Sequence, residues 1–168
     1  MKINVLVVLV ISLLLPCAGM QSAFALEHIQ KDGLFSMEIP EAWHWVENPQ
    51  EVIITYPDGN TVAIDIELAP SHNLSQAQMK KMLNDADDKM IKEGILAHNG
   101  TLIDRKETVL GSNVHASQLD FKTTPPNPIE VTYISFFYKN YVFTITYGST
   151  DDKMRSVMDD AVASMKLR

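Results

Sequence analysis

Side chains that could carry out chemistry are few in this chain and widely spaced. Five histidines are spread over the sequence: His28, His44, His72, His98 and His115. No two of them have the short separation that places metal ligands on one face of a helix or strand. We therefore interpret each as a surface or turn histidine. His44, between two tryptophans, and His115, within a predicted strand, are the two weak metal-ligand candidates that we retain.

Nucleophiles and acids are also scattered. Ser112 and His115 are close in sequence, but without an evident orienting acid they are weak evidence for nucleophilic catalysis. Asp85, Asp87 and Asp88 lack the glycine and distal glutamate of a calcium loop, and we expect them on the solvated face of a helix. We predict no catalytic residue, no metal site and no cofactor, and the protein is predicted not to be an enzyme. A hydrolase with a composite site built from distant acids stays an alternative.

Three aromatic residues are the candidates for partner binding: Trp45, Tyr133 and Phe137. Trp43 and Trp45 have the same strand parity, so one can anchor the core while the other lies at the rim of a bend. Tyr133 and Phe137, with Val142, share the outer face of a predicted hairpin. That face would form an exposed apolar patch if no helix covered it. If a helix covers it, the first hairpin strand is buried on both faces.

Residues 129–148, IEVTYISFFYKNYVFTITYG, form the hairpin that must organise the fold. They are dense in β-branched and aromatic residues, and Lys139 and Asn140 provide the turn. The pattern predicts facing pairs on two sides of the hairpin: Tyr138–Tyr141, Phe136–Phe143, Ile134–Ile145 and Thr132–Tyr147 on one, and Phe137–Val142, Ser135–Thr144 and Tyr133–Thr146 on the other. Because two strands alone are marginally stable, this hairpin needs further strands and a helical cover.

Alternating apolar residues predict the further strands, at 33–40, 52–56, 61–68, 101–110 and 114–122. The last two are more polar and are placed towards a sheet edge. Within 33–40 we expect Ser36 and Glu38 to face outward, and within 61–68 we expect Leu68 to face inward with Val62, Ile64 and Ile66. Residues 26–31 are interpreted as a connecting arm, and the two tryptophans as part of a bend.

Two amphipathic helices complete the pattern. The first begins at Ser75, with Gln78 as the capping-box partner, and is expected to end at Gly94. The second begins near residues 149–151. Their predicted apolar stripes are Met79, Met82, Leu83, Ala86 and Met90 in the first, and Met154, Val157, Met158, Ala161, Val162 and Met165 in the second. The order of elements predicts an α+β domain in which helices pack on an antiparallel sheet.

The first 25 residues predict a cleaved signal peptide. Lys2 supplies the positive end, residues 5–15 form an apolar run shorter than the roughly 20 residues of a permanent membrane helix, and residues 23–25, AFA, fit a cleavage site. Cys17, the single cysteine, could instead carry the lipid of a lipoprotein, but Pro16 stands where a small residue normally precedes such a cysteine. We favour cleavage after Ala25, which leaves a single domain at 26–168 without a membrane span.

The chain of 168 residues carries a formal net charge of -7, which disfavours nucleic acid as a partner. Three short segments resemble an exported family: residues 35–40, FSMEIP, followed by Trp43; residues 110–111, LG; and residues 163–167, ASMKL. They are similar to the PsbP-like and DcrB-like proteins, which share a fold with PsbP of photosystem II and a Ran-binding import factor. The resemblance implies an antiparallel sheet sandwiched by helices and a role as an assembly factor, adaptor or chaperone-like module, without a shared catalytic set.

These observations together predict a periplasmic or secreted, non-catalytic binding or adaptor module whose partner is another envelope or secreted protein. Three alternatives stay open. The protein could be a small-ligand carrier with a pocket between sheet and helix, a metal-binding protein that uses His44 or His115, or the composite-site hydrolase.

Overall fold

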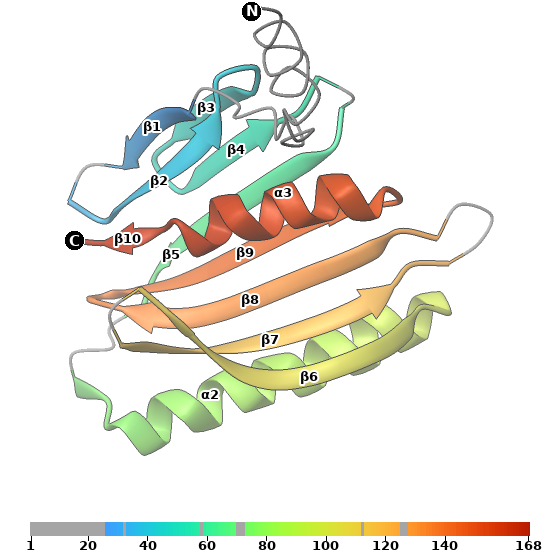
Figure 1. Cartoon of the computed structure of the whole chain (residues 1–168). Helices are drawn as coiled ribbons and strands as arrows, with labels where there is room; N and C mark the ends of the chain where they lie inside the picture. The colour runs from blue at the N-terminus through green and yellow to red at the C-terminus, as the bar shows by residue number, and fades with distance from the viewer. Residues whose placement is uncertain (1–25, 32, 58, 70–72, 112, 125–127) are drawn as a thin grey trace, which may run out of the picture.

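The computed structural model describes residues 26–168 except 32, 58, 70–72, 112 and 125–127. The predicted signal peptide, with Cys17, therefore lies outside the described residues. The described chain forms two antiparallel sheets and two main helices, which confirms the predicted α+β class (Figure 1). No helix in this described part is both long enough and apolar enough to span a membrane.

The main sheet has seven strands in the order β3-β4-β5-β9-β8-β7-β6. Their bounds, in that order, are His44–Asn48, Glu51–Thr55, Thr61–Leu68, Tyr141–Ser149, Glu130–Tyr138, Val114–Lys122 and Thr101–Leu110. The polar strands β6 and β7 lie at one edge, as their composition predicted. Trp45 lies in the opposite edge strand, β3, paired with Ile54 of β4, so the prediction of a bend there was wrong.

The hairpin β8–β9 has the predicted register at every pair from Thr132–Tyr147 to Tyr138–Tyr141. Lys139 adopts a positive φ of 53° in the turn. Phe136 and Phe143 are fully buried and stack with ring centroids 5.0 Å apart. The alternation of aromatic and β-branched residues was sufficient to predict this register, because a slip by one residue would move the buried set to the other face.

A second, three-stranded sheet combines β1 (Leu26–Lys31), β2 (Phe35–Pro40) and β10 (Lys166–Leu167), with β2 in the centre. The segment expected to be a connecting arm is thus a strand. Ser36, expected to face outward, is buried because it lies between Gln30 of β1 and Lys166 of β10.

Helix α3 (Asp152–Ala163) crosses one face of the main sheet beside the small sheet (Figure 1). Asp151 caps its N-terminus by accepting hydrogen bonds from the backbone N–H groups of Lys153 and Met154. The predicted stripe packs inward, with Met158 fully buried. Leu68 departs from the prediction: it lies at the last pair of the β5–β9 ladder and is 74 % exposed.

The opposite face of the main sheet carries α2 (Gln76–Lys89), which continues through the π-helical turn η2 (Met90–Ile95) and the 3₁₀ turn η3 (Leu96–His98). Its capping box between Ser75 and Gln78 is confirmed. The helix does not end at Gly94; it ends at Asn99, which adopts a left-handed φ of 57°. Glycine at 94 leaves room for the Met90 side chain, since a Cβ there would lie 2.6 Å from the Met90 sulfur.

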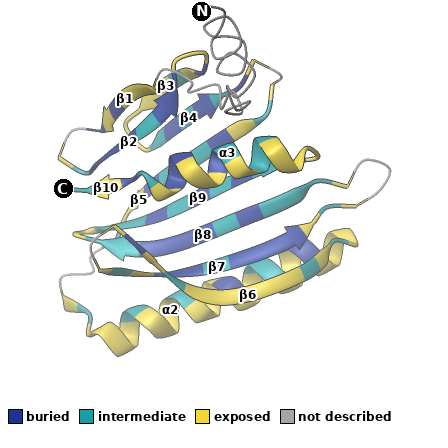
Figure 2. Cartoon of the chain, viewed as in Figure 1, coloured by how far each residue is buried: buried dark blue, intermediate teal, exposed yellow. Residues whose placement is uncertain are grey.

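The residues of α2 that face the sheet are not the ones predicted, because the buried side of the helix is rotated about its axis relative to the predicted apolar stripe. Met82 and Ala86 are exposed, and Figure 2 shows much of α2 exposed along its outer side. The one fully buried residue of α2 is Asp87, so its predicted place on the solvated face was wrong. The residues that are buried or half-buried along α2 and η2 are Met79, Leu83, Asp87, Met90, Ile91, Gly94 and Ile95.

Candidate functional site: the cleft beneath helix α2

A row of polar residues crosses the sheet face beneath α2. Glu107 of β6 pairs with Ser117 of β7, Ser117 pairs with Ser135 of β8, and Ser135 pairs with Thr144 of β9. Side chains at directly opposite positions of neighbouring strands share one face. The sheet therefore presents a continuous polar line to the helix instead of an apolar surface.

Asp87 of α2 lies above this line and is fully buried, with 0 % of its surface exposed. The hydroxyl of Ser117 donates a hydrogen bond to Asp87 Oδ2. Within the described residues, Asp87 Oδ1 and the buried hydroxyl oxygen of Ser135 have no hydrogen-bond partner. Such unsatisfied buried polar groups are rare in folded proteins and call for an explanation.

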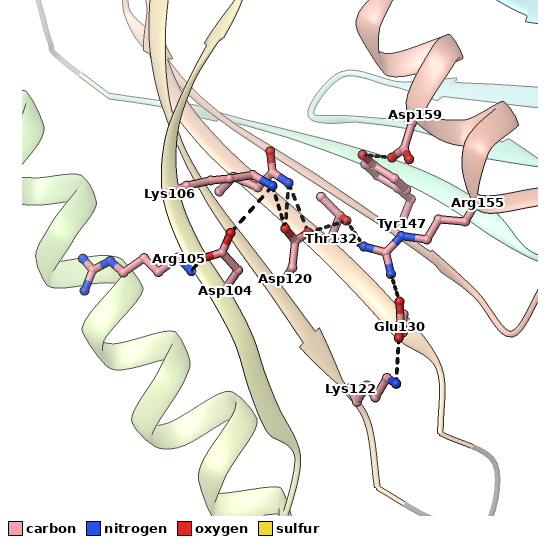
Figure 3. Close-up of polar contacts among 11 residues, drawn as sticks. Asp104, Arg105, Lys106, Asp120, Lys122, Glu130, Thr132, Tyr147, Arg155 and Asp159 are labelled. Carbon is pink, nitrogen blue, oxygen red and sulfur yellow. Dashed lines mark hydrogen bonds and ion pairs between the residues drawn. The ribbon is translucent and has the colours of Figure 1, made fainter. Parts of the chain in front are cut away.

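Arg105 of β6 reaches Asp87 from the side. Its Nη2 lies 3.4 Å from Asp87 Oδ2, whereas its Nη1 lies 2.6 Å from Asp88 Oδ1. Figure 3 shows Arg105 leaving β6 towards α2, while the adjacent Lys106 points to the other face of the sheet. The guanidinium is thus held mainly by Asp88 and only partly compensates the buried carboxylate.

The electrostatics of the site agree with this geometry. Burial raises the pKa of Asp87, and the hydrogen bond from Ser117 and the charge of Arg105 oppose that rise. Burial also raises the pKa of Tyr133, which lies on the same sheet face, and the negative charge of Asp87 adds to that rise. The site therefore resists negative charge and is short of positive charge.

A cleft of about 410 Å³ opens between α2 and strands β6, β7 and β8. Its apolar walls are Met79 and Leu83 from the helix and Val114 and Phe137 from the sheet. Ser117, which donates a hydrogen bond to Asp87, also lines it, so a single side chain connects the cleft to the buried acid. Apolar walls with a few convergent polar groups are the usual composition of a ligand site.

An ion pair between Lys80 of α2 and Glu107 of β6 crosses the mouth of the cleft. The hydrogen bond and charge of Lys80 lower the pKa of Glu107. Both side chains are more than half exposed, at 61 % and 65 %, and an exposed pair of this kind contributes little to stability. The pair can therefore open without a large change in folding free energy.

The structure brings together some of the residues that the sequence singled out and separates others. Phe137 and His115 line the α2 cleft. Tyr133 lies on the same face but packs against Leu119 and the η2 residue Ile95. Because α2 and η2 cover part of this face, the outer side of the hairpin is not the freely exposed patch that the sequence allowed.

Trp45 and His44 lie far from this cleft in the sheet, on edge strand β3. Trp45 packs from the other face against the main core, and its indole N–H lies 3.4 Å from Glu27. His44 is exposed. Trp43 is buried against Tyr56, as expected for a core anchor.

The cleft contains a serine, a histidine and a nearby acid, but not in a hydrolytic order. Ser117 donates directly to Asp87, whereas in a serine-hydrolase triad the histidine lies between the serine and the acid. Ser112, the other serine considered, lies outside the described residues. Among the residues that the structure describes, no group of three or more His, Cys, Asp or Glu side chains is arranged to hold a metal.

A second polar cluster lies on the opposite face of the sheet, at the N-terminal half of α3 (Figure 3). Arg155 of α3 donates to Glu130 at 2.6 Å and to the Thr132 hydroxyl at 3.0 Å. Asp120 accepts from Thr132 at 2.7 Å and from Lys106 at 3.0 Å. These groups satisfy one another, so we interpret the cluster as the attachment of α3 to the sheet.

Sequence reasoning missed Asp87 and Ser135. For Asp87 a usable signal was present, because Met79, Leu83, Asp87, Ile91 and Ile95 recur at intervals of four residues. An acidic residue within a series of apolar residues at helical spacing indicates a carboxylate on the buried face of the helix. For Ser135, by contrast, the predicted hairpin correctly indicated the sheet face on which it lies. It could not indicate that the buried carboxylate of Asp87 lies on the same side of the sheet.

Comparison with known proteins defines the class of fold. No protein-family model and no curated protein matches the chain. Among solved structures, cyanobacterial PsbP (CyanoP) from Synechocystis sp. PCC 6803 matches with a TM-score of 0.64 and 11% identity, over 92% of this chain and 99% of that chain. A Pseudomonas aeruginosa protein of unknown function, PA94, matches with a TM-score of 0.45 and 12% identity, over 80% of this chain and 89% of that one. The chain thus has a PsbP-like fold, and the match does not separate PsbP-like from DcrB-like proteins.

Proposed function

We propose that this protein is an exported, non-catalytic binding module and that the α2 cleft is its binding site. The observation that carries the proposal is Asp87, a buried acid with one unsatisfied oxygen, beside a cleft with apolar walls. The PsbP-like fold agrees with an accessory role but does not identify a ligand.

The energetic argument starts from the helix stripe. Leu83 and Ile91, at four residues on either side of Asp87, are apolar, so a leucine at 87 would continue the stripe. Burying a carboxylate that is incompletely paired costs several kcal/mol. A residue that lowers stability in this way, in contact with a side chain that lines a cleft, is typical of a functional site.

The size of the cleft supports a small ligand. Its volume of about 410 Å³ falls within the range of roughly 300–1,000 Å³ that is usual for small-molecule sites. The walls of the cleft come from a helix and from adjacent strands of one sheet, and such a site is largely formed before the ligand arrives.

The binding test is a titration of the mature domain with decanol, an uncharged probe, followed by NMR chemical shifts. We expect saturable binding of one molecule, with the largest shifts at Leu83, Ser117 and Phe137. Phe137→Ala should weaken binding by about tenfold, because it removes an aromatic wall. Trp45→Ala, an aromatic truncation on the other face, is the matched control and should have no effect. Absence of binding, or loss of binding only in Trp45→Ala, would contradict the assignment.

Export is the other part of the proposal. Cleavage after Ala25 would leave β1 whole, since this strand begins at Leu26. We expect the intact mass of protein recovered from the envelope or medium to correspond to residues 26–168 without lipid. A mass that retains the first segment or includes an acyl group on Cys17 would contradict it.

A second candidate is an adaptor that binds another envelope protein through Trp45. Trp45 lies on the edge strand β3 and stays half-exposed, next to Val46, which is 59 % exposed. Capture of envelope proteins with the mature domain and with Trp45→Ala tests this candidate. A partner lost only with Trp45→Ala would favour the adaptor over the cleft.

A further inference from the structure

We propose that the α2 cleft selects a small molecule that carries a primary ammonium group on an apolar body, with Asp87 and Ser117 receiving the ammonium. This inference rests on the proposed function and adds to it the sign of the ligand's charge. It follows from the acceptors and donors around Ser117, which lines the cleft and donates to Asp87.

One lysine and one arginine near the cleft already have acceptors. Lys80 is paired with Glu107 across the mouth. Arg105 is paired with Asp88 at 2.6 Å and also donates to the side-chain oxygen of Asn84 at 3.2 Å. Neither cation is therefore available to hold an anionic ligand without breaking an existing pair.

Two hydrogen-bond acceptors near the cleft, by contrast, have no donor within the described residues. Asp87 Oδ1 has no donor within the described residues, and the same is true of the Ser135 hydroxyl oxygen. Ser117 lies between the two, because it pairs with Ser135 across the strands and donates to Asp87. An ammonium group offers three donors and a positive charge, and it can satisfy several acceptors at once.

An anionic or neutral head group fits less well. A carboxylate would be repelled by Asp87 and by Glu107, which lines the same cleft. A hydroxyl could donate one hydrogen bond but would leave the buried negative charge only partly compensated by Arg105. Burial raises the pKa of Asp87, in agreement with a carboxylate that lacks a full counter-charge.

The walls specify the rest of the ligand. Met79, Leu83 and Val114 provide flexible or branched apolar surface, and Phe137 adds an aromatic ring to the same lining. An aromatic ring also attracts a nearby cation through its π face. A linear or compact hydrocarbon body that ends in an amine matches this combination.

The test compares three ligands of equal chain length, decylamine, decanol and decanoate, by isothermal titration calorimetry at neutral pH. Decylamine is then cationic and decanoate anionic. We expect decylamine to bind at least about tenfold more tightly than decanol, and decanoate to bind most weakly. This comparison uses the wild-type domain and does not depend on any variant folding.

The variant Asp87→Asn should reduce the preference for decylamine over decanol to within about threefold. Asp85→Asn is the matched control: it lies on the same helix, removes the same charge and is exposed in an ion pair with Lys81. Asp65→Asn removes a charge from the open acidic hollow between β4 and β5. Neither control should change the preference.

Each outcome decides the inference. Equal binding of decylamine and decanol would overturn the ammonium assignment while leaving the cleft as a binding site. Loss of the preference in Asp85→Asn or Asp65→Asn would show general attraction to an acidic protein and would also overturn it. Failure of all three probes to bind would overturn the proposed function itself.

Discussion

Asp87 occupies a position that the rest of α2 gives to apolar side chains. Its Ser117 hydrogen bond and its longer contact with Arg105 define a polar site inside an otherwise ordinary helix–sheet interface. The placement is determined by residues on two other strands, so composition alone could not give it. At the residue scale, function and stability are therefore expected to oppose each other here.

The first prediction concerns the cost in stability of burying the Asp87 carboxylate. Burial raises the pKa of Asp87 above its usual 3.8, so its contribution to stability is greatest at acid pH and is lost as pH rises through the folded-state pKa. Asp87→Asn should therefore raise the free energy of unfolding at neutral pH by about 1 kcal/mol. The gain should shrink below about pH 4, where the wild-type carboxylate is protonated in both states.

Urea unfolding at neutral and acid pH, on wild type and variant, measures this difference. Asp85→Asn provides the control and should stay within about 0.5 kcal/mol of wild type, as expected for an exposed site. Destabilisation by Asp87→Asn at neutral pH would instead show that the contact with Arg105 is a stabilising ion pair.

At the scale of elements, the two helices are attached in different ways. α3 combines a buried apolar stripe with the polar cluster around Arg155 and Asp120. α2 has Asp87 as its one fully buried residue and otherwise relies on half-buried side chains. We therefore expect α2 to be the less firmly held of the two, which agrees with the proposal that it borders a ligand cleft.

Asp120 supplies the second prediction. Burial alone would raise its pKa, but hydrogen bonds from Thr132, Gln118 and Lys106 lower it. Its stabilising effect is thus present above the unfolded-state pKa and is lost as pH falls through the lower folded-state pKa. Asp120→Ala should lower the free energy of unfolding by about 3 kcal/mol, because it leaves buried partners unpaired.

The control for Asp120→Ala is Asp104→Ala, which removes an exposed acid 3.9 Å from Lys106 on the same face. It should change stability by less than about 0.5 kcal/mol. Equal effects of the two substitutions in urea unfolding would contradict a special role for the buried carboxylate.

Much of the element pattern could be predicted from the sequence, for reasons that are local. The hairpin register followed from alternating residues around Lys139 and Asn140, and the start of α2 followed from Ser75 and Gln78. The phase of α2 could not be predicted with the same success, because Met82 and Ala86 are as apolar as the residues that actually face inward. In the observed orientation of α2, Asp87 faces the sheet and contacts Ser117 and Arg105, which are distant in sequence.

The same limit explains the other errors. Residues 26–31, LEHIQK, alternate too weakly to indicate a strand, and β1 forms because β2 offers it a partner. In the candidate site, Phe137 and His115 could be proposed from residue type and strand position. Their meeting with Leu83 and Ser117 in one cleft depends on tertiary packing.

At the scale of the whole molecule, one core joins both sheets and α3. Met158 of α3 lies in it, fully buried, together with Phe35 of the small sheet and Phe143 of the main sheet. The third prediction is that Met158→Ala lowers the free energy of unfolding by about 3 kcal/mol, because it leaves a cavity.

Met82→Ala is the matched control, since it truncates the same side chain on a helix where 47 % of it is exposed. It should change the free energy of unfolding by less than about 0.5 kcal/mol. Thermal and urea unfolding of both variants provide the comparison. A small effect of Met158→Ala would show that the layers are only loosely joined.

The small sheet has a consequence for biogenesis. Its central strand is hydrogen-bonded on one edge to residues 26–31 and on the other to residues 166–167, so early and late parts of the polypeptide must meet before it is complete. Pairings between such distant segments form slowly. Until residues 166–167 have been synthesised and docked, the edge of β2 that they cover stays open for pairing, so the small sheet is among the later parts of the fold to be completed.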